Sequence, residues 1–322
     1  MSNKIILVDG SSYLYRAFHA VPNLTTHNGF PTGAITGVLN MLFRLLDEND
    51  PAYFCVVFDA PGGSFRNKLY AEYKAQRSKM PDELREQIEP LHEIIDCLKF
   101  KKIILPDVEA DDVIGTLAQL AQNQGLEVMI STSDKDMAQL VNEKIYMVNS
   151  ANNIVLDQEG VKNKFGVRPD QIIDYLTLIG DQSDNIPGVP GIGPKTAKQL
   201  LDAYQTLDGI TANLDKISGK KAVVENIKQH LEHLPLYKAL VTIDTKLPID
   251  ISIDDFQREK PDLNQLIPLL EKFELTQIKN RFTTNNIPKN IPLNINYQSI
   301  TNEEVLIQHI KEIETIGSFS IN

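Results

Sequence analysis

The sequence predicts an α/β fold in which a mostly parallel central sheet is flanked by helices. Short apolar, β-branched runs recur along the first half of the chain, and longer segments with a helical period lie between them. Strands that alternate with helices form parallel sheets, because each helix carries the chain back to the edge where the next strand starts. Each run also ends in a carboxylate, and open parallel sheets bind ligands at this carboxyl edge.

The elements of the first half follow one another in a regular order. Strands are expected at 4–8, 53–58, 102–105 and 126–131, and helices at 34–46 and 113–121. The first helix is assigned because its apolar residues, such as Ile35, Val38 and Leu39, recur every three or four positions. The core domain is expected to span residues 1–178.

The second half predicts a helical subdomain over 179–282. Helical periodicity is present in 169–178, 195–204, 221–240 and 263–281, and a loop rich in glycine and proline precedes the second of these. Residues 283–296 contain five asparagines and two prolines without periodicity, which is typical of a linker. Residues 297–322 are expected to form one helix and one short strand, as a tail or as the start of a following domain.

Composition sets limits on location and partners. A formal charge of −11 argues, taken alone, against a partner as negative as DNA. The sequence contains neither a signal-peptide core nor about 18 consecutive apolar residues, so we expect a soluble cytoplasmic protein that makes no membrane contact. Cys55 and Cys97 are expected to be buried free thiols, since two isolated cysteines support neither a disulfide framework nor a zinc site.

Nine carboxylates are expected to converge at the carboxyl edge of the sheet. They are Asp9, Asp59, Glu109, Asp111, Asp112, Asp134, Asp136, Asp181 and Asp184. Like charges about 4 Å apart repel by roughly 4 kcal/mol at an effective dielectric of 20, so such a cluster needs cations. Oxygen ligands alone favour Mg²⁺ or Mn²⁺, and two such ions ~4 Å apart are a common catalyst of phosphodiester hydrolysis. Any one of these acids could instead be a helix cap, but EADD (109–112) and SDKD (133–136) place five acids where two caps would suffice.

Two further segments predict contact with nucleic acid. GVPGIGPKTA (188–197) resembles the hairpin of a helix-hairpin-helix motif, in which glycines let the backbone approach a phosphate. Its candidate DNA contacts are Gly188, Gly191, Gly193, Lys195 and Thr196. The basic run 65–79 supplies Arg66, Tyr73, Lys74 and Arg77, which suit phosphate contact and base stacking. A plain helix–helix turn and a solvated charged helix are the alternatives for these two segments.

Five ordered motifs resemble a known family. They are LVDGSSYLYRAFHA (7–20), VVFDAPGGSFRNKLYAEYKAQR (56–77), VEADDVIGTLA (108–118), STSDKDMAQLV (131–141) and GDQSDNIPGVPGIGPKTA (180–197). Together they are similar to the 5′-nuclease (5′→3′ exonuclease) domains of bacterial DNA polymerase I, which belong to the flap-endonuclease family. The resemblance covers about residues 1–285, and it implies a PIN-like 5′-nuclease fold with a helical arch at about 65–100.

The resemblance also implies roles for individual residues. One metal ion would be held by Asp9, Asp59, Glu109 and Asp111, and a second by Asp111, Asp134, Asp136 and Asp181. Asp112 and Asp184 match acids that hold metal-bound water. Lys74 and Arg77 match the catalytic pair at the scissile phosphate, Tyr73 matches a stacking aromatic, and Arg16 lies in a motif placed near the substrate. A potassium ion is implied near 185–193.

The expected function is therefore that of a divalent-metal-dependent, structure-specific 5′-nuclease. Its partners would be DNA with a 5′ flap or nick and RNA primers, in replication and repair, and it would act as a monomer associated with the bacterial nucleoid. A polymerase domain could follow residue 322; the final GSFSIN lacks the Asp-x-Glu pair of the family's 3′-exonuclease domain, so no proofreading activity is expected within these residues. A PIN-type RNase and a non-catalytic DNA-binding module remain the alternatives.

Overall fold

The central sheet has six strands in the order β3-β2-β1-β4-β5-β6. Their bounds are β1 (Ser2–Asp9), β2 (Pro51–Asp59), β3 (Lys101–Leu105), β4 (Glu127–Thr132), β5 (Ile145–Asn149) and β6 (Val155–Leu156). Neighbours from β3 to β5 pair in parallel and β5 pairs with β6 antiparallel. The predicted mostly parallel sheet is confirmed, with its four predicted strands and two further short strands at one edge. The computed structural model describes residues 2–21, 24–149, 152, 154–283 and 307.

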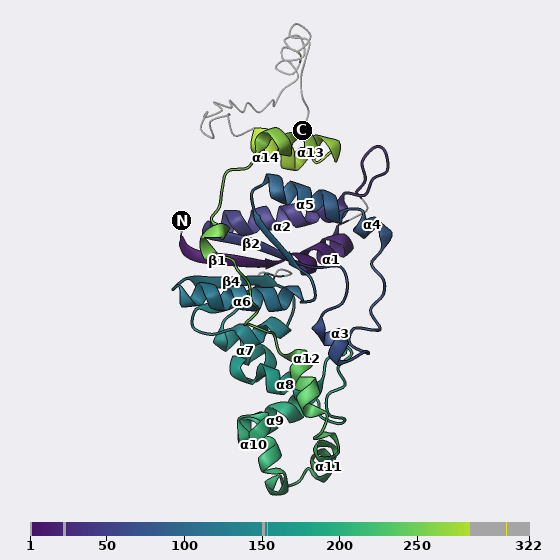
Figure 1. Ribbon diagram of the computed structural model, residues 1–322, viewed down its shortest axis with the longest axis vertical. Coiled ribbons are helices and arrows are strands. Elements are labelled where there is room, and N and C mark those ends of the chain that lie inside the picture. Colours follow the sequence, from purple (N-terminus) through teal and green to yellow (C-terminus); the bar gives the residue numbers. More distant parts are fainter. Residues whose placement is uncertain (1, 22–23, 150–151, 153, 284–306, 308–322) are drawn as a thin grey trace. The chain divides into compact units, whose positions relative to one another are not determined.

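Helices cover both faces of this sheet (Figure 1). One face packs against α1 (Gly10–Ala20), α2 (Gly33–Asn49) and α5 (Ile88–Cys97), and the other against α6 (Ala110–Asn123). Successive residues of a strand point to opposite faces. In β1, Ile6 and Val8 accordingly join the core under α1, α2 and α5, whereas Ile5 and Leu7 join the core under α6. All four are fully buried, as expected of a strand covered on both faces.

Six further helices form the end of the molecule drawn in teal and green (Figure 1). They are α7 (Gln158–Phe165), α8 (Ile172–Ile179), α9 (Pro194–Tyr204), α10 (Leu207–Ala212), α11 (Lys221–His230) and α12 (Leu234–Val241). The single helix predicted over 221–240 is thus two helices. The second contains Pro235 in its first turn, where the missing N–H costs nothing.

After α12 the chain returns along α6 toward the sheet. Thr116 in α6 donates to the backbone O of Asp244 (3.2 Å), and α13 (Leu263–Lys272) then packs against α5. The helix predicted over 263–281 is also divided, because Glu274 has a φ of 55° and separates α13 from α14 (Thr276–Thr283). Two short helices, α3 (Phe65–Leu69) and α4 (Asp82–Arg85), lie in the segment predicted as an arch.

Residues 1–282 form one compact unit, and the division of that unit at residue 178 stays a prediction. Apart from Thr283 and Ile307, the predicted linker and tail lie outside the described residues. Cys55 and Cys97 are buried free thiols, as predicted. Within the described ranges, the helices are too short or too polar to cross a membrane.

Candidate active site

The carboxyl ends of β1 and β2 place two acids at the mouth of a cleft. Asp9 ends β1 and caps α1: its Oδ1 accepts from the backbone N–H of Ser12 (2.9 Å), and its Oδ2 accepts from the Thr132 hydroxyl at the end of β4 (2.7 Å). Asp59 ends β2 and accepts from the backbone N–H of Ala110, the first residue of α6 (2.9 Å). Both acids therefore occupy positions fixed by the sheet.

The start of α6 and the loop after β4 complete the cleft. Glu109 is the N-cap of α6, Asp111 lies in its first turn, and Asp134 follows β4. The cleft has a volume of about 400 Å³. Its lining residues are Asp9, Ser11, Ser12, Tyr15, Asp59, Lys74, Arg77, Glu109, Asp111, Ser133, Asp134, Lys135 and Ser183. The structure thus brings five of the nine predicted acids and both predicted catalytic cations to one cavity.

Four acids of this region have a raised pKa, so their ionised forms are unfavourable in this structure. Burial, followed by the charges of Asp59 and Asp134, raises the pKa of Asp9 to about 7. Burial and the neighbouring carboxylates also raise the pKa of Asp111 well above its usual range, and burial raises those of Asp134 and Asp136. Such perturbed groups in a cleft are typical of functional sites.

Two other acids are paired with lysines. Burial alone would raise the pKa of Glu109, but the Lys74 ammonium, 2.9 Å from its Oε2, and the Arg66 guanidinium lower it. Burial is likewise outweighed at Asp181, whose pKa is lowered by bonds from Ser183 and from Lys135, 3.0 Å away. We did not predict that Lys135 pairs with Asp181. Its position between the predicted ligands Asp134 and Asp136 was the one sign of this pairing in the sequence.

The donor chemistry fits a hard divalent cation. Every side chain of the cluster offers oxygen, and Asp136 Oδ1 is buried without a hydrogen-bond partner among the described residues. Within the same residues, no three acidic, histidine or cysteine side chains are arranged to hold a metal ion as they stand. Lys74 and Lys135 instead form ion pairs with Glu109 and Asp181.

The loop after α3 brings the cationic pair to the cleft. Lys74 adopts a φ of 55°, and its backbone N–H donates to the carbonyl of Asp184 (3.0 Å). The Asp184 carboxylate accepts from Arg77 Nη2 (2.6 Å) and from the Tyr73 hydroxyl (2.9 Å). Because the Tyr73 ring is only 2% exposed, it does not present a face for base stacking in this structure.

Asp112 and Arg66 lie outside the cleft. Arg66 donates to both carboxylate oxygens of Asp112 (2.7 and 2.8 Å), and the two side chains are 3% and 0% exposed. Neither side chain lines the cleft in this structure. Their predicted roles, holding metal-bound water and contacting DNA, stay predictions.

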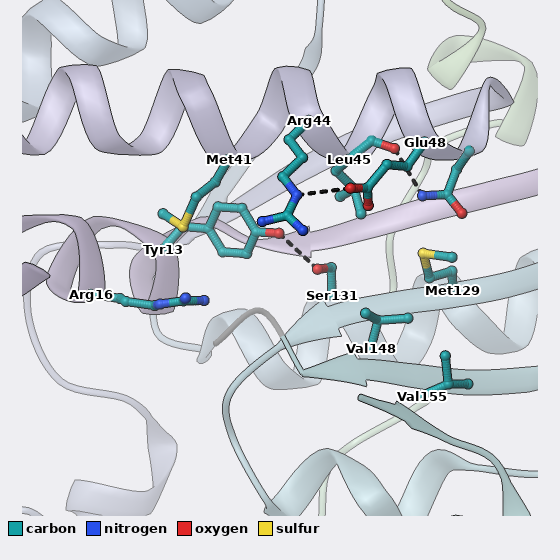
Figure 2. Close-up of a pocket in the computed structure, with 11 residues that line it drawn as sticks. Tyr13, Arg16, Met41, Arg44, Leu45, Glu48, Met129, Ser131, Val148 and Val155 are labelled. Atoms are coloured by element: carbon teal, nitrogen blue, oxygen red, sulfur yellow. Dashed lines mark hydrogen bonds and ion pairs between the residues drawn. The ribbon is translucent and has the colours of Figure 1, made fainter. Parts of the chain in front are cut away.

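Arg16 lines a different cavity. Figure 2 shows it across from α2 in a pocket of about 210 Å³ that Met41, Arg44 and Val148 also line. The Tyr13 hydroxyl and Ser131 Oγ are 2.8 Å apart at the back of this pocket. Arg16 is thus on the same helix as Ser11 and Ser12, which line the acid cleft, but lies outside that cleft.

The predicted hairpin connects α8 to α9, and its glycines differ in what they allow. Gly188 has a φ of 65°, and a Cβ there would lie 2.3 Å from the backbone N of Gly180. Gly191 also has a positive φ, 77°. Gly193, which caps α9, has an ordinary φ and open space around it. Lys195 and Thr196 lie in the first turn of α9, so this end of the helix carries backbone N–H groups and a lysine suited to an anion.

Comparison with known proteins gives consistent matches. Residues 4–166 match the family described as "5′-3′ exonuclease, N-terminal resolvase-like domain", and residues 167–264 match "5′-3′ exonuclease, C-terminal SAM fold". The DNA polymerase I of Pseudomonas aeruginosa is 49% identical over 276 residues, which are 84% of this chain and 30% of that protein. The 5′-3′ exonuclease of Aquifex aeolicus is 43% identical over 274 residues, 85% of this chain and 93% of that protein.

Solved structures show the same fold. The bacteriophage T5 flap endonuclease, in a complex with DNA and metal ions, has a TM-score of 0.65 at 20% identity and covers 83% of this chain and 99% of its own. The catalytic core of Rad2 with a DNA substrate has a TM-score of 0.60 at 20% identity, covering 87% and 91%.

Proposed function

Because this chain belongs to the 5′-3′ exonuclease family, we propose that it hydrolyses phosphodiester bonds at 5′ flaps and 5′ ends of duplex DNA and at RNA primers, in the acid cleft at the carboxyl edge of its sheet. The observation that supports this site is one cavity that contains five carboxylates together with Lys74 and Arg77, with the pKa of Asp111 raised well above its usual range. The chain spans about 30% of the length of the matched polymerase. A polymerase domain beyond residue 322 is part of the proposal. The proposal also includes action as a monomer in the bacterial cytoplasm, close to the nucleoid.

Divalent ions, Mg²⁺ or Mn²⁺, are the proposed cofactor. Structures of the T5 enzyme that contain metal ions support this assignment. Two or more ions would be held by Asp9, Asp59, Glu109, Asp111, Asp134, Asp136 and Asp181, with Asp184 beside them. When bound, they would neutralise these acids and polarise the phosphate and a water molecule. A potassium ion near 185–193 is part of the same proposal.

The chain's own residues would hold the substrate. Lys74 and Arg77 reach the cleft from the loop after α3, where a phosphate with its developing charge can replace Glu109 and Asp184 as their partner. The glycine hairpin and the first turn of α9 would hold the phosphates of the duplex without reading bases.

A labelled 5′-flap duplex tests the proposal. In Mg²⁺ the wild-type protein should release the flap, and Asp111→Asn or Asp134→Asn should abolish release. Asp96→Asn is the matched control, because Asp96 is exposed and pairs only with Lys102 among the interactions of this kind that we find. Tight flap binding without any metal-dependent cleavage by the wild type would indicate a non-catalytic module, and a preference for single-stranded RNA would indicate a PIN-type RNase.

A further inference from the structure

We propose that the buried pair Arg66 and Asp112 is a positioning junction, through which engagement of duplex DNA by the helical end sets the geometry of the acid cleft. The inference rests on the proposed function and adds a means by which the enzyme favours flaps that carry a long duplex. Neither residue touches the substrate; both act through the groups that they hold in place.

The junction joins three segments that are far apart in the sequence. Arg66 lies in α3, at the base of the predicted arch, and Asp112 lies in the first turn of α6. Arg66 Nε donates to the carbonyl of Leu240 (2.9 Å) and its Nη2 donates to the carbonyl of Thr242 (2.6 Å), at the end of α12. From the same segment, the backbone N–H of Asp244 donates to Asp112 Oδ1 (2.8 Å).

The helical end is firmly attached to this segment. Helix α12 packs against α8, and α8 leads directly into the loop that carries Asp181 and the glycine hairpin. Gln139 braces the segment from the other side: its Nε2 donates to the carbonyl of Val241 (2.9 Å), and its Oε1 accepts from the N–H of Ile243 (2.9 Å). A force on the hairpin therefore reaches the partners of Arg66 through packed helices.

The junction is equally attached to the cleft. Asp112 Oδ2 accepts from the backbone N–H of Glu109 (3.2 Å), and Arg66 Nη1 lies 3.7 Å from Glu109 Oε2. Asp111 is the neighbour of Asp112 in the same helical turn. Asn67, next to Arg66, donates to the carbonyl of Tyr73 (3.2 Å) and so holds the loop that presents Lys74. A shift of α12 would thus move the acids and the lysine together.

The chemistry of the pair suits a junction better than a simple packing contact. A guanidinium that donates two hydrogen bonds to a carboxylate and others to carbonyl groups holds these partners in one arrangement, whereas apolar side chains can slide past one another. Buried pairs of this kind are no guarantee of added stability, since desolvation opposes the attraction between the charges. Their contribution here would be to the alignment of three segments.

The test compares cleavage of two substrates with the same 5′ flap. One carries a duplex long enough to lie along the hairpin and α9, and the other carries a duplex too short to reach them. Because a displacement of about 1 Å can cost on the order of 100-fold in rate, we expect the wild-type single-turnover rate to be higher on the long duplex by up to this factor. In Asp112→Asn the two rates should converge on the lower one, while the dissociation constant for the long duplex stays close to that of the wild type.

Two further variants keep the result interpretable. Asp112→Asn leaves a buried guanidinium unpaired and can fail to fold, so Arg66→Met combined with Asp112→Asn removes both charges at similar volume. The matched control is Lys228→Met combined with Asp215→Asn, which removes an ion pair (3.0 Å) in the helical end that lies outside the contact between α8 and α12. All rates are measured below the melting temperatures of the variants.

The outcomes separate the inference from the proposed function. If the wild type cleaves neither substrate, the proposed function fails. If the wild type cleaves both equally, or if the Arg66 and Asp112 variants keep the wild-type rate ratio, only the inference is overturned. A loss of the ratio in the control pair as well would also overturn it, because general loosening of the helical end would then explain the effect.

Discussion

Asp111 is half-buried among carboxylates, and partial burial together with their charges makes its ionised form unfavourable in the metal-free fold. The acids that surround it, Asp9, Asp59 and Asp134, all raise its pKa. A functional site that is destabilising in itself is common in enzymes, since binding groups are placed for the ligand and not for the empty fold.

Asp111→Asn should therefore separate stability from activity. We expect the metal-free protein to gain about 1–2 kcal/mol in its free energy of unfolding, while flap cleavage in Mg²⁺ falls at least about 100-fold. Urea denaturation in EDTA and a cleavage assay measure the two effects. Asp96→Asn should change neither, and a loss of metal-free stability in Asp111→Asn would contradict the electrostatic argument.

The raised pKa of Asp9 predicts a pH dependence. Between the unfolded pKa of 3.8 and the folded pKa of about 7, the folded protein binds a proton that the unfolded chain has released. The stability from this group is present in full below the lower value and is lost as the pH rises through the higher one, by up to about 4 kcal/mol. The difference in unfolding free energy between wild type and Asp9→Asn, measured in EDTA across this range, should change in that direction; a difference independent of pH would be evidence against it.

Residue types in sequence order predicted most of the site, but not how its members pair. The acids at strand ends could be predicted because every parallel strand ends at the same edge. The bond between Arg66 and Asp112 could not, because it depends on the return of residues 240–244 to α6, far from both residues in sequence. The same holds for Tyr73, whose ring is covered by segments that its local sequence does not contain.

At the scale of elements, the hairpin between α8 and α9 contains glycines with two different functions. Gly188 serves the turn itself, since its positive φ and the approach of the Gly180 backbone leave no room for a side chain. Gly193 serves the surface, where its environment is open. The two positions therefore form a natural pair for mutation.

Gly188→Ala should destabilise the protein by about 2–4 kcal/mol through backbone strain and overpacking. Gly193→Ala should leave stability within about 0.5 kcal/mol of the wild type and instead weaken duplex binding, because a methyl group would keep phosphates away from the N-terminus of α9. Thermal unfolding and fluorescence anisotropy with duplex DNA distinguish the effects. Equal changes in stability and in duplex affinity for the two variants would refute the assignment of different functions to Gly188 and Gly193.

Element boundaries were predicted less well than element types. Helical periodicity alone did not reveal the break at 231–233 between α11 and α12, or the one at Glu274 between α13 and α14. Strands β5 and β6 were missed because they have only five and two residues, too few for a clear alternating pattern; β5 is held by pairing with β4, and β6 by pairing with β5.

At the scale of the molecule, the charge of −11 takes on a different meaning. Nine of the 43 acidic residues belong to the predicted site, so under the proposed function the net charge does not argue against a nucleic-acid partner. Bound divalent ions would neutralise acids of the cleft and allow it to accept phosphate.

Flap-duplex affinity should therefore fall when divalent metal is removed, and it should also fall with rising salt as counterions are released. Anisotropy titrations in Ca²⁺ and in EDTA, each over a range of KCl concentrations, measure both. We expect EDTA to weaken binding by at least about tenfold, which corresponds to about 1.4 kcal/mol. Equal affinity with and without the divalent ion would contradict the interpretation of the charge.

The topology of the sheet has a consequence for synthesis of the protein. The first strand made, β1, lies inside the sheet, and the cleft combines its Asp9 with side chains that follow β2, β3 and β4. Near these side chains, Asp112 accepts a hydrogen bond from the backbone N–H of Asp244. This bond, which supports the cleft, can form only after the much later segment that contains Asp244 has been synthesised. Such long-range contacts form late in folding. A partly translated chain therefore lacks the bond between Asp112 and Asp244, and under the proposed function its hydrolytic centre would be complete only after synthesis has passed α12.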